Sequence, residues 1–310
     1  MHRAAASCDS CSNQCSMASP RIRIGISGWR YAPWRGTFYP QGLPQREELK
    51  YASGALSIIE INGSFYSLQR PESYAKWYEE TPADFMFSLK GPRYITHMKR
   101  LKGIEKPIAN FFASGLFNLR EKLGPLLWQF PPNFIYDEER MRAFLELLPR
   151  DTAGAAALAR KRAAFMKGRT RLGIDANRPL RYAIEIRNES FLNRSFIDLL
   201  REYKVAAVIA ETARRWPMIE DITADFIYLR LHGDKEIYRS AYSDKALQRW
   251  AERIAAWSRG TEPSDAHRVV PERVAPKKNR DVYCFFDNTD VKLRAPFDAQ
   301  TLRKKVGLVR

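Results

Sequence analysis

The segment 57–66, SIIEINGSFY, places a carboxylate and an amide two residues apart at the end of an apolar run. Successive side chains of a strand point to opposite faces, so residues at positions i and i+2 share one face. Glu60 and Asn62 therefore face one side, and Ile59 and Ile61 face the other. The segment predicts a buried strand that turns polar on one face at its carboxyl end.

Eight short apolar runs, this one included, alternate with amphipathic segments along the chain. Helical spacing is clearest in 44–53, 71–80, 137–148, 193–203 and 243–257. Strands that are apolar on both faces and alternate with helices predict a parallel sheet covered by helices. Eight repeats favour a closed (β/α)₈ TIM barrel over an open doubly wound sheet. The predicted strands are 22–29, 57–62, 85–90, 124–130, 182–187, 205–211, 226–233 and 281–288.

Two common nucleotide-binding motifs are missing from the sequence. After the first predicted strand, Gly25, Ser27 and Gly28 are followed by Trp29 and Arg30, which does not match G-x-G-x-x-G. No GK[ST] loop of the Walker type occurs either. The sequence therefore does not predict a dinucleotide-binding or P-loop protein.

The length and composition are those of a globular protein. The chain has 310 residues, of which 45% are hydrophobic and 28% are charged, and we expect residues 21–310 to form a single barrel domain. No apolar run approaches the roughly 18 residues of a membrane span, and the N-terminus lacks the apolar region of a secretory signal. We therefore expect a cytoplasmic protein without a membrane partner.

The chain is strongly basic, with 52 Lys and Arg against 35 Asp and Glu and a net charge of +17. Such a surface attracts anions, including nucleic acid and phosphorylated metabolites. Much of the excess lies in the segment 149–181, a predicted insertion between strands 4 and 5 that starts as an alanine-rich basic helix. A second basic loop spans 259–280. We favour a solvated outer surface for the insertion, with a nucleic-acid-binding arm as the alternative.

Three of the four cysteines lie close together in the Cys- and Ser-rich segment 1–20. The spacing of Cys8, Cys11 and Cys15 suggests a metal or iron–sulfur site, but the segment offers no evident fourth ligand. We therefore expect a flexible tail here rather than an iron–sulfur centre. Cys284 lies in an apolar run and is predicted to be a core residue.

Polar residues recur at the carboxyl ends of the predicted strands. In a (β/α)₈ barrel these ends form the active-site face, so inward-facing side chains would converge on one pocket. The alternative is that they pair with one another, for example Glu60 or Glu185 with Arg187 or Arg230. Because six strand ends share the pattern, we favour a site. The residues are Glu60, Asn62, Lys90, Gln129, Glu185, Arg187, Arg230, His232, Asp287 and Asn288.

The residue types suggest roles in such a site. Two carboxylates in different surroundings can serve as acid and base, and histidine can move a proton or bind a metal. We expect catalytic roles for Glu60, Glu185, His232 and His97, the last in the segment YITH. We expect substrate contacts, with Lys and Arg holding an anionic group, from Asn62, Lys90, Gln129, Arg187, Arg230 and Asn288. A divalent metal at the strand ends is an open alternative.

Six ordered motifs resemble the YecE-like family, known as a domain of unknown function. They are GISGWRYAPWRGTFYP (25–40), EINGSFY (60–66), FSLKGPRYITH (87–97), LGPLLWQFPP (123–132), IEIRNESF (184–191) and YLRLHG (228–233). The resemblance implies a TIM barrel and no established reaction. The chain has Asn188 and Phe191 where the family usually has His and Trp, and Glu211 where Asp is common.

Two hypotheses about function follow. The first is an enzyme, a hydrolase, lyase or isomerase, that acts on a phosphate- or carboxylate-bearing small molecule at the strand ends. The second is a nucleic-acid-binding protein without catalysis, which uses the basic insertion and stacks bases on Trp29, Tyr31 and Trp34. A phosphodiester-cleaving enzyme would combine the two. The sequence does not predict an oligomeric state.

Overall fold

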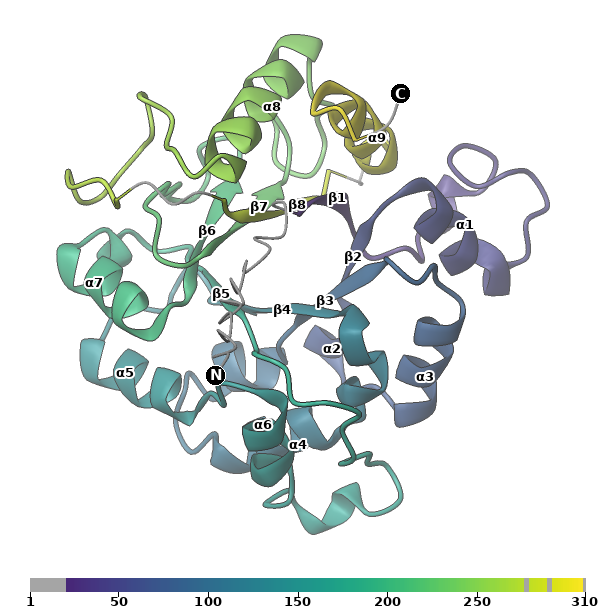
Figure 1. Cartoon of the computed structure of the whole chain (residues 1–310), viewed down its shortest axis with the longest axis vertical. Helices are drawn as coiled ribbons and strands as arrows, with labels where there is room; N and C mark the ends of the chain where they lie inside the picture. The colour runs from purple at the N-terminus through teal and green to yellow at the C-terminus, as the bar shows by residue number, and fades with distance from the viewer. Residues whose placement is uncertain (1–20, 276–278, 289–291, 309–310) are drawn as a thin grey trace, which may run out of the picture.

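Eight parallel strands close into a barrel in the computed structural model, which describes residues 21–275, 279–288 and 292–308. Each strand pairs with the next along the chain, and β8 pairs with β1 to close the sheet (Figure 1). The predicted (β/α)₈ TIM barrel is confirmed. The strands are β1 (Ile22–Ser27), β2 (Ile58–Ile61), β3 (Met86–Lys90), β4 (Leu123–Gln129), β5 (Tyr182–Glu185), β6 (Ala206–Glu211), β7 (Phe226–Leu231) and β8 (Asp281–Phe286).

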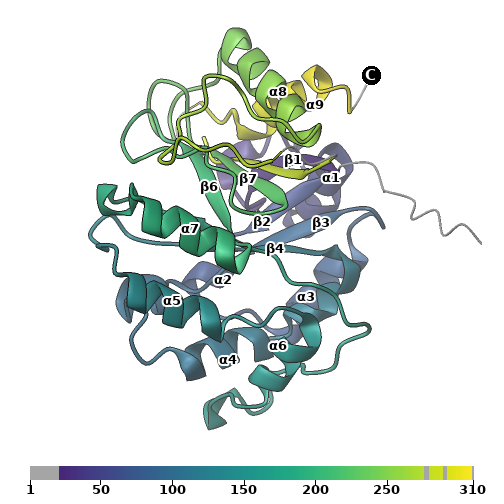
Figure 2. The same ribbon diagram turned by 60° about the vertical axis from the view of Figure 1, so that its left-hand side comes forward.

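Helices surround the barrel on its outer side (Figures 1 and 2). They are α1 (Glu48–Ala55), α2 (Gly63–Tyr66), α3 (Pro71–Glu79), α4 (Glu105–Ala113), α5 (Glu138–Leu147), α6 (Thr152–Ala159), α7 (Arg194–Tyr203), α8 (Asp244–Ser258) and α9 (Ala295–Lys305). Shorter turns are η1 (Ala32–Trp34), η2 (Gln45–Glu47), the π-helical η3 (Tyr94–Met98), η4 (Leu116–Lys122), η5 (Ala164–Met166) and η6 (Glu189–Phe191). The five segments with helical spacing correspond to α1, α3, α5, α7 and α8.

Side-chain caps explain where several of these helices begin. Asp137, Asp151, Asn193 and Ser243 each accept a hydrogen bond from the backbone N–H three residues further on, at the start of α5, α6, α7 and α8. Such a cap pairs a donor that the helix itself leaves unsatisfied. Three of these caps, Asp137, Asn193 and Ser243, are the first residues of predicted helical segments.

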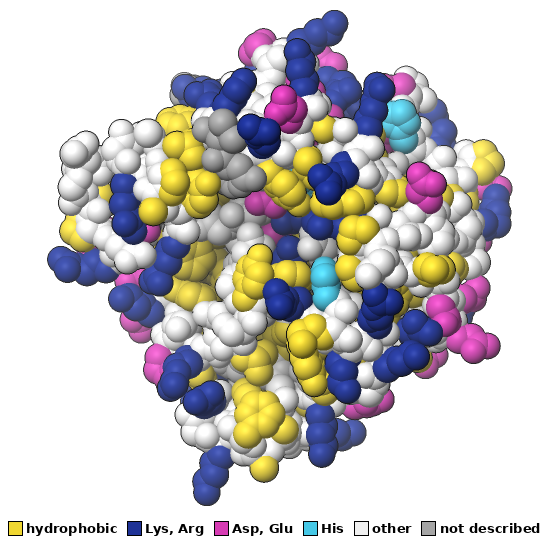
Figure 3. Space-filling model, turned by 180° about the vertical axis from the view of Figure 1, so that it is seen from behind, with side chains coloured by type: hydrophobic (Ala, Val, Ile, Leu, Met, Phe, Trp, Pro, Cys, Tyr) yellow, Lys and Arg dark blue, Asp and Glu magenta, His cyan; other side chains and the backbone are white. Residues whose placement is uncertain are grey.

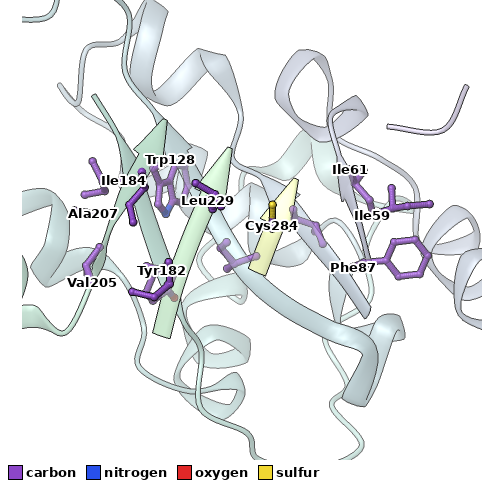
Figure 4. Packing of buried hydrophobic residues seen from close by; sticks show 14 of the residues in the cluster. Ile59, Ile61, Phe87, Trp128, Tyr182, Ile184, Val205, Ala207, Leu229 and Cys284 are labelled. Carbon is purple, nitrogen blue, oxygen red and sulfur yellow. The ribbon is translucent and has the colours of Figure 1, made fainter. Parts of the chain in front are cut away.

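The two faces of each strand belong to different parts of the core. Residues that point outward pack against the helices; Figure 4 shows several of them, including Ile59, Trp128 and Cys284. A second cluster consists almost wholly of strand residues and fills the barrel interior. It contains Ile58, Met86, Leu127, Ala183, Ala206, Val208, Ala210, Ala224, Phe226, Tyr228, Tyr283 and Phe285. Because side chains alternate along a strand, the residues two positions after this layer also face inward.

The basic insertion lies on the outside of the barrel. Its helix α6 packs against α4, and Arg178 forms an ion pair with Asp175 at 2.7 Å. Trp29 and Trp34, considered above as stacking groups, are buried and pack in the loop after β1. The Cys8, Cys11 and Cys15 cluster lies outside the described residues. Within the part of the chain that the structure describes, no helix is both long and apolar enough to cross a bilayer.

The closest backbone approach in the barrel generates a stability prediction. A Cβ atom at position 25 would lie 1.7 Å from the backbone oxygen of Ile58, whereas a Cβ at Gly54 in α1 would meet nothing within 4 Å. Gly25→Ala should therefore lower the free energy of unfolding by about 3 kcal/mol, because β1 and β2 must move apart. Gly54→Ala should raise it by about 0.5–1 kcal/mol through helix propensity. Urea unfolding of both variants checks this, and equal effects would contradict the close approach.

Candidate functional site

A buried arginine connects two carboxylates above the apolar interior of the barrel. Arg230 on β7 is fully buried and donates to Glu60 on β2 from Nε at 3.1 Å and Nη2 at 2.8 Å. Its Nη1 donates to Glu185 Oε2 on β5 at 2.5 Å. Two N–H groups directed at one carboxylate give the strong two-pronged pairing that arginine favours.

Hydroxyl groups hold the Glu60 carboxylate from its other sides. Tyr228 donates to Glu60 Oε2 at 2.7 Å and Ser27 donates to Oε1 at 3.2 Å. The Tyr228 oxygen is also 2.7 Å from Ser88 Oγ, which donates to the backbone oxygen of Pro125. Strands on both sides of the barrel therefore fix the orientation of Glu60.

Glu185 is fixed in the same way, by three donors. Gln129 Nε2 and Arg187 Nε donate to its Oε1 at 2.7 and 2.9 Å, in addition to the bond from Arg230. Burial alone would raise the pKa of Glu185, but the charges of Arg230 and Arg187 outweigh it and hold the pKa well below its usual range. Glu185 is therefore a carboxylate at neutral pH.

This geometry favours mutual pairing for part of the predicted set. Glu60 and Glu185 direct their oxygens at Arg230 and other donors, as in the ion-pair alternative considered from the sequence. A carboxylate that is so fully engaged is a weak proton acceptor. Proton transfer at this site is thus better assigned to groups that face open space.

His232 lies beside Arg230 and is also fully buried. Its Nε2 is 3.2 Å from Arg230 Nη1, and because guanidinium groups only donate, Nε2 must accept. The ring proton then sits on Nδ1, which is 3.2 Å from Asp287 Oδ2. Burial and the charge of Arg230 lower the pKa of His232. His232 is therefore a neutral member of the buried network.

A pocket of about 630 Å³ opens above this network at the carboxyl ends of the strands. Figure 3 shows the face opposite that of Figure 1, where Lys and Arg side chains and a histidine border a hollow near the middle of the molecule. The pocket is lined by Asn62, Phe65, Tyr66, Lys90, Arg93, His97, Met98, Gln129, Arg187, Tyr238 and Asp287. Of the ten predicted catalytic and substrate-contact residues, five line this pocket.

Lys90 at the end of β3 differs from the other charged strand-end residues. Its side chain is buried, and among the described residues its Nζ makes neither a hydrogen bond nor an ion pair. The ammonium lies 4.2 Å from the centre of the Phe65 ring. Burial, followed by the charge of Arg230, lowers the pKa of Lys90 to about 8 even though Glu60, Glu185 and Asp287 act in the opposite direction.

His97 lies in the π-helical turn η3, which places its ring at the pocket wall. Its Nδ1 is 2.9 Å from Thr96 Oγ1, and its ring meets Phe65 edge-on at 5.0 Å. Burial, with the charges of Lys90 and Arg187, lowers the pKa of His97 to about 4. His97 is therefore a neutral imidazole at the pocket surface.

Arg187 separates the pocket from a second hollow of about 940 Å³. Its guanidinium stacks on Trp216 at 3.8 Å and donates to the Tyr238 hydroxyl at 3.3 Å, in addition to its bond with Glu185. These contacts hold the planar group in one orientation at the mouth of the barrel.

Two of the predicted amides have different surroundings. Asn62 lines the pocket, and its buried Oδ1 has no hydrogen-bond partner among the described residues. Asn288 does not line it: its amide donates to Asp298 at 2.8 Å and to the backbone oxygen of Ser240 at 3.1 Å. Asn288 follows the outward-facing Phe286 by two positions, so the alternation of side chains directs it away from the barrel axis.

Sequence reasoning did not include several residues that the structure brings to the site. Tyr228 shares the inward parity of Arg230, so counting back by two would have found it. Asp287, predicted as a strand-end residue without an assigned role, shares the inward parity of Phe285. Phe65 lies in the one-turn helix α2 and Tyr238 in a loop, and neither segment is long enough for a periodicity to indicate the direction of its side chains. Glu211, which stands where the family commonly has Asp, faces outward and accepts from Trp250 at 2.7 Å.

The alternative of a divalent metal at the strand ends stays a prediction. Among the residues that the structure describes, no group of three or more His, Cys, Asp or Glu side chains is placed to hold a metal ion. The carboxylates of Glu60 and Glu185 point at guanidinium nitrogens instead.

The Arg230 network generates a second prediction. Arg230→Met leaves two buried carboxylates without their cation and should lower the free energy of unfolding at pH 7 by about 3–5 kcal/mol. The triple variant Arg230→Met, Glu60→Gln, Glu185→Gln removes both charges and should recover part of the loss. The deficit of the single variant should shrink as the pH falls, because its carboxyl groups become neutral. Urea unfolding between pH 4 and 8 measures both effects, and a triple variant no more stable than the single one would contradict the pairing.

Comparisons with known proteins agree with this architecture. The family model described as protein of unknown function DUF72 matches residues 23–310. YecE of Escherichia coli O157:H7 is 24% identical over 244 residues, which cover 78% of this chain and 84% of YecE. YunF of Bacillus subtilis is 30% identical over 125 residues, which cover 39% of this chain and 43% of YunF.

Solved structures show the same fold. A DUF72 family protein from Thermotoga maritima has a TM-score of 0.68 at 23% identity and covers 92% of this chain and 98% of its own. One from Enterococcus faecalis has a TM-score of 0.65 at 19% identity and covers 93% of this chain and 96% of its own. The family match spans nearly the whole described barrel and includes the carboxyl ends of all eight strands. The chain belongs to the DUF72 family, which includes the YecE-like proteins.

Proposed function

We propose that the protein is an enzyme that acts on a small anionic molecule bound in the pocket at the carboxyl ends of the strands. The observation that carries the proposal is the buried Lys90 ammonium, which faces the pocket and forms no ion pair with a carboxylate among the residues that the structure describes. A buried charge is costly unless an opposite charge or a set of acceptors compensates it. A phosphate or carboxylate group of a substrate would supply that compensation.

The remaining charges of the pocket favour an anion as well. Arg187 and the exposed Arg93 line it together with Lys90, and Asp287 supplies the one carboxylate among the described lining residues. That carboxylate is already 3.2 Å from Arg230 Nη2. The lining is therefore cationic overall, which favours attraction to a bound anion.

The size of the pocket favours a metabolite over a nucleic acid. Its volume of about 630 Å³ lies within the range of about 300–1,000 Å³ that is usual for small-molecule sites. No residue of the basic insertion lines it. The small-molecule hypothesis thus rests on the barrel mouth, independently of the charge on the outer surface.

Groups able to move protons border the same space. His97 is neutral, so it can accept or relay a proton. Burial raises the pKa of the Tyr238 hydroxyl, which therefore stays protonated and can donate. Glu60 and Glu185 instead orient Arg230 and Arg187. We infer a lyase or isomerase reaction, in which protons move next to the anionic group, in preference to a hydrolase that needs a free carboxylate pair.

Anion binding is the first test of the proposal. Sulfate should bind to the wild-type protein in isothermal titration calorimetry, and Lys90→Met should weaken it by at least about tenfold, the effect of one lost charge-assisted contact. Lys161→Met, which removes the same charge from the exposed surface of the basic insertion, is the matched control and should bind as wild type. Equal loss in both variants, or no binding, would contradict the site.

The pH dependence of sulfate binding follows from Lys90. Sulfate stays fully ionised, whereas Lys90 loses its proton as the pH rises through about 8. Affinity should therefore be constant below that pH and fall by up to about tenfold per pH unit above it. Lys90→Arg should remove the decline, because a guanidinium keeps its charge across this pH range. A wild-type affinity that is flat from pH 7 to 10 would exclude Lys90 as an anion contact.

Catalysis is the second test. A screen of phosphorylated and carboxylated metabolites should find a turnover that His97→Ala lowers by about 10²–10⁴-fold, as expected for a lost proton-transfer group. Sulfate should compete with the substrate. Activity that survives unchanged in both His97→Ala and Lys90→Met would place the chemistry elsewhere.

A further inference from the structure

We propose that the Lys90 amine forms an imine with its substrate, so that the substrate class is aldehydes and ketones that also carry a carboxylate or phosphate. This inference rests on the proposed function and assigns Lys90 a covalent role within the same pocket. Arg187, with Arg93, would hold the anionic group while the carbonyl carbon lies against Nζ.

The surroundings of Lys90 are those of a reactive group rather than a structural one. The other buried lysine, Lys122, shows what a structural role requires: its Nζ donates to the backbone oxygens of Tyr78 and Thr81 at 2.6 and 2.8 Å and to Thr81 Oγ1 at 3.1 Å. Lys90 Nζ has no such acceptor among the described residues and opens into the pocket. Its position at the end of β3 fixes the backbone from which it reaches.

An unprotonated amine is available at this position near neutral pH. Burial and the neighbouring guanidinium of Arg230 lower the pKa of Lys90 to about 8, so about one amine in ten is neutral at pH 7, against fewer than about one in a thousand for an ordinary lysine. A desolvated lysine beside another cation is an established way to activate an amine. The nearby Phe65 ring supplies an apolar wall without a proton acceptor.

The chemistry balances with groups that border the pocket. The nitrogen lone pair attacks the carbonyl carbon, a C–N bond forms, and the carbonyl π electrons move to oxygen, which takes up the proton released when the Lys90 ammonium became an amine. Loss of that oxygen as water and transfer of one nitrogen proton leave a protonated imine. The cationic imine then draws electrons from the adjacent carbon, which favours removal of a proton or cleavage of a carbon–carbon bond there.

His97 is positioned to carry the protons of these steps. It and Lys90 contact the same ring, at 5.0 Å between the His97 and Phe65 centroids and 4.2 Å from Nζ to the Phe65 centroid. Its Nδ1 is engaged by Thr96, which leaves Nε2 as the nitrogen for exchange with a substrate. The neutral ring can take a proton from the amine adduct and return it to the leaving oxygen.

Reductive trapping tests the inference. The full-length protein is incubated at pH 7.5 with glyoxylate or pyruvate and sodium cyanoborohydride, and the modified peptide is identified by mass spectrometry. We expect one adduct per chain on Lys90, at a rate at least tenfold above that of the exposed Lys161. Acetaldehyde, a carbonyl without an anionic group, should show no such preference, and sulfate should slow the glyoxylate reaction.

The variants separate this inference from the proposed function. Lys90→Arg keeps the positive charge, so it should retain sulfate binding and lose the adduct. Wild-type protein that binds sulfate but gives no Lys90 adduct, or one no faster than at Lys161, would overturn the imine and leave the anion site intact. Absence of both sulfate binding and adduct would overturn the anion site as well.

Discussion

The ion pairs that Arg230 makes with Glu60 and Glu185 are the constraint on which the candidate site depends. They connect β2, β5 and β7 across the barrel axis, at bonds of 2.5–3.1 Å. Burying one cation between two carboxylates leaves little net charge in the interior, and each remaining carboxylate oxygen position is met by a hydroxyl, amide or guanidinium donor. Satisfied networks of this kind hold their members in a single geometry.

The same network sets the electrostatics of the pocket above it. The charge of Arg230 contributes to lowering the pKa of Lys90 and of His232, while it helps to hold Glu185 in its ionised form. The carboxylates of Glu60 and Glu185 therefore act mainly on their neighbours, whereas the Lys90 amine and the His97 imidazole line the pocket. A buried scaffold of charge thus tunes a small number of accessible groups.

Much of this could be predicted from the sequence because strands impose a two-residue period. The pairs Glu60 with Asn62, Glu185 with Arg187, and Arg230 with His232 are visible as letters, and barrel closure brings their strands together. The alternation also explains why Asn288, a predicted substrate contact, lies outside both the Arg230 network and the pocket. Asn288 has the parity of the outer face, while its neighbour Asp287 has that of the interior.

Other features depend on distances that no sequence pattern contains. Lys90 and Arg230 are both cations at strand ends. Arg230 forms ion pairs with Glu60 and Glu185, whereas Lys90 has no ion-pair partner among the described residues. Phe65, His97 and Tyr238 reach the pocket from short segments between the strands and the outer helices, and these segments show no periodicity in the sequence. No sequence pattern predicted the π-helical turn η3 that carries His97. Side-chain direction in loops is set by packing, which only the folded chain shows.

The division between strand ends and loops has a consequence for how such a barrel changes over time. The Arg230 network belongs to the strands, and the pocket walls at Phe65, His97 and Tyr238 belong to the loops. Insertions or exchanges in the loops can alter the shape of the cavity without moving the charges beneath it. Libraries that vary loop residues alone would therefore sample different pocket shapes above an unchanged network of charges, with the barrel's folding left nearly untouched.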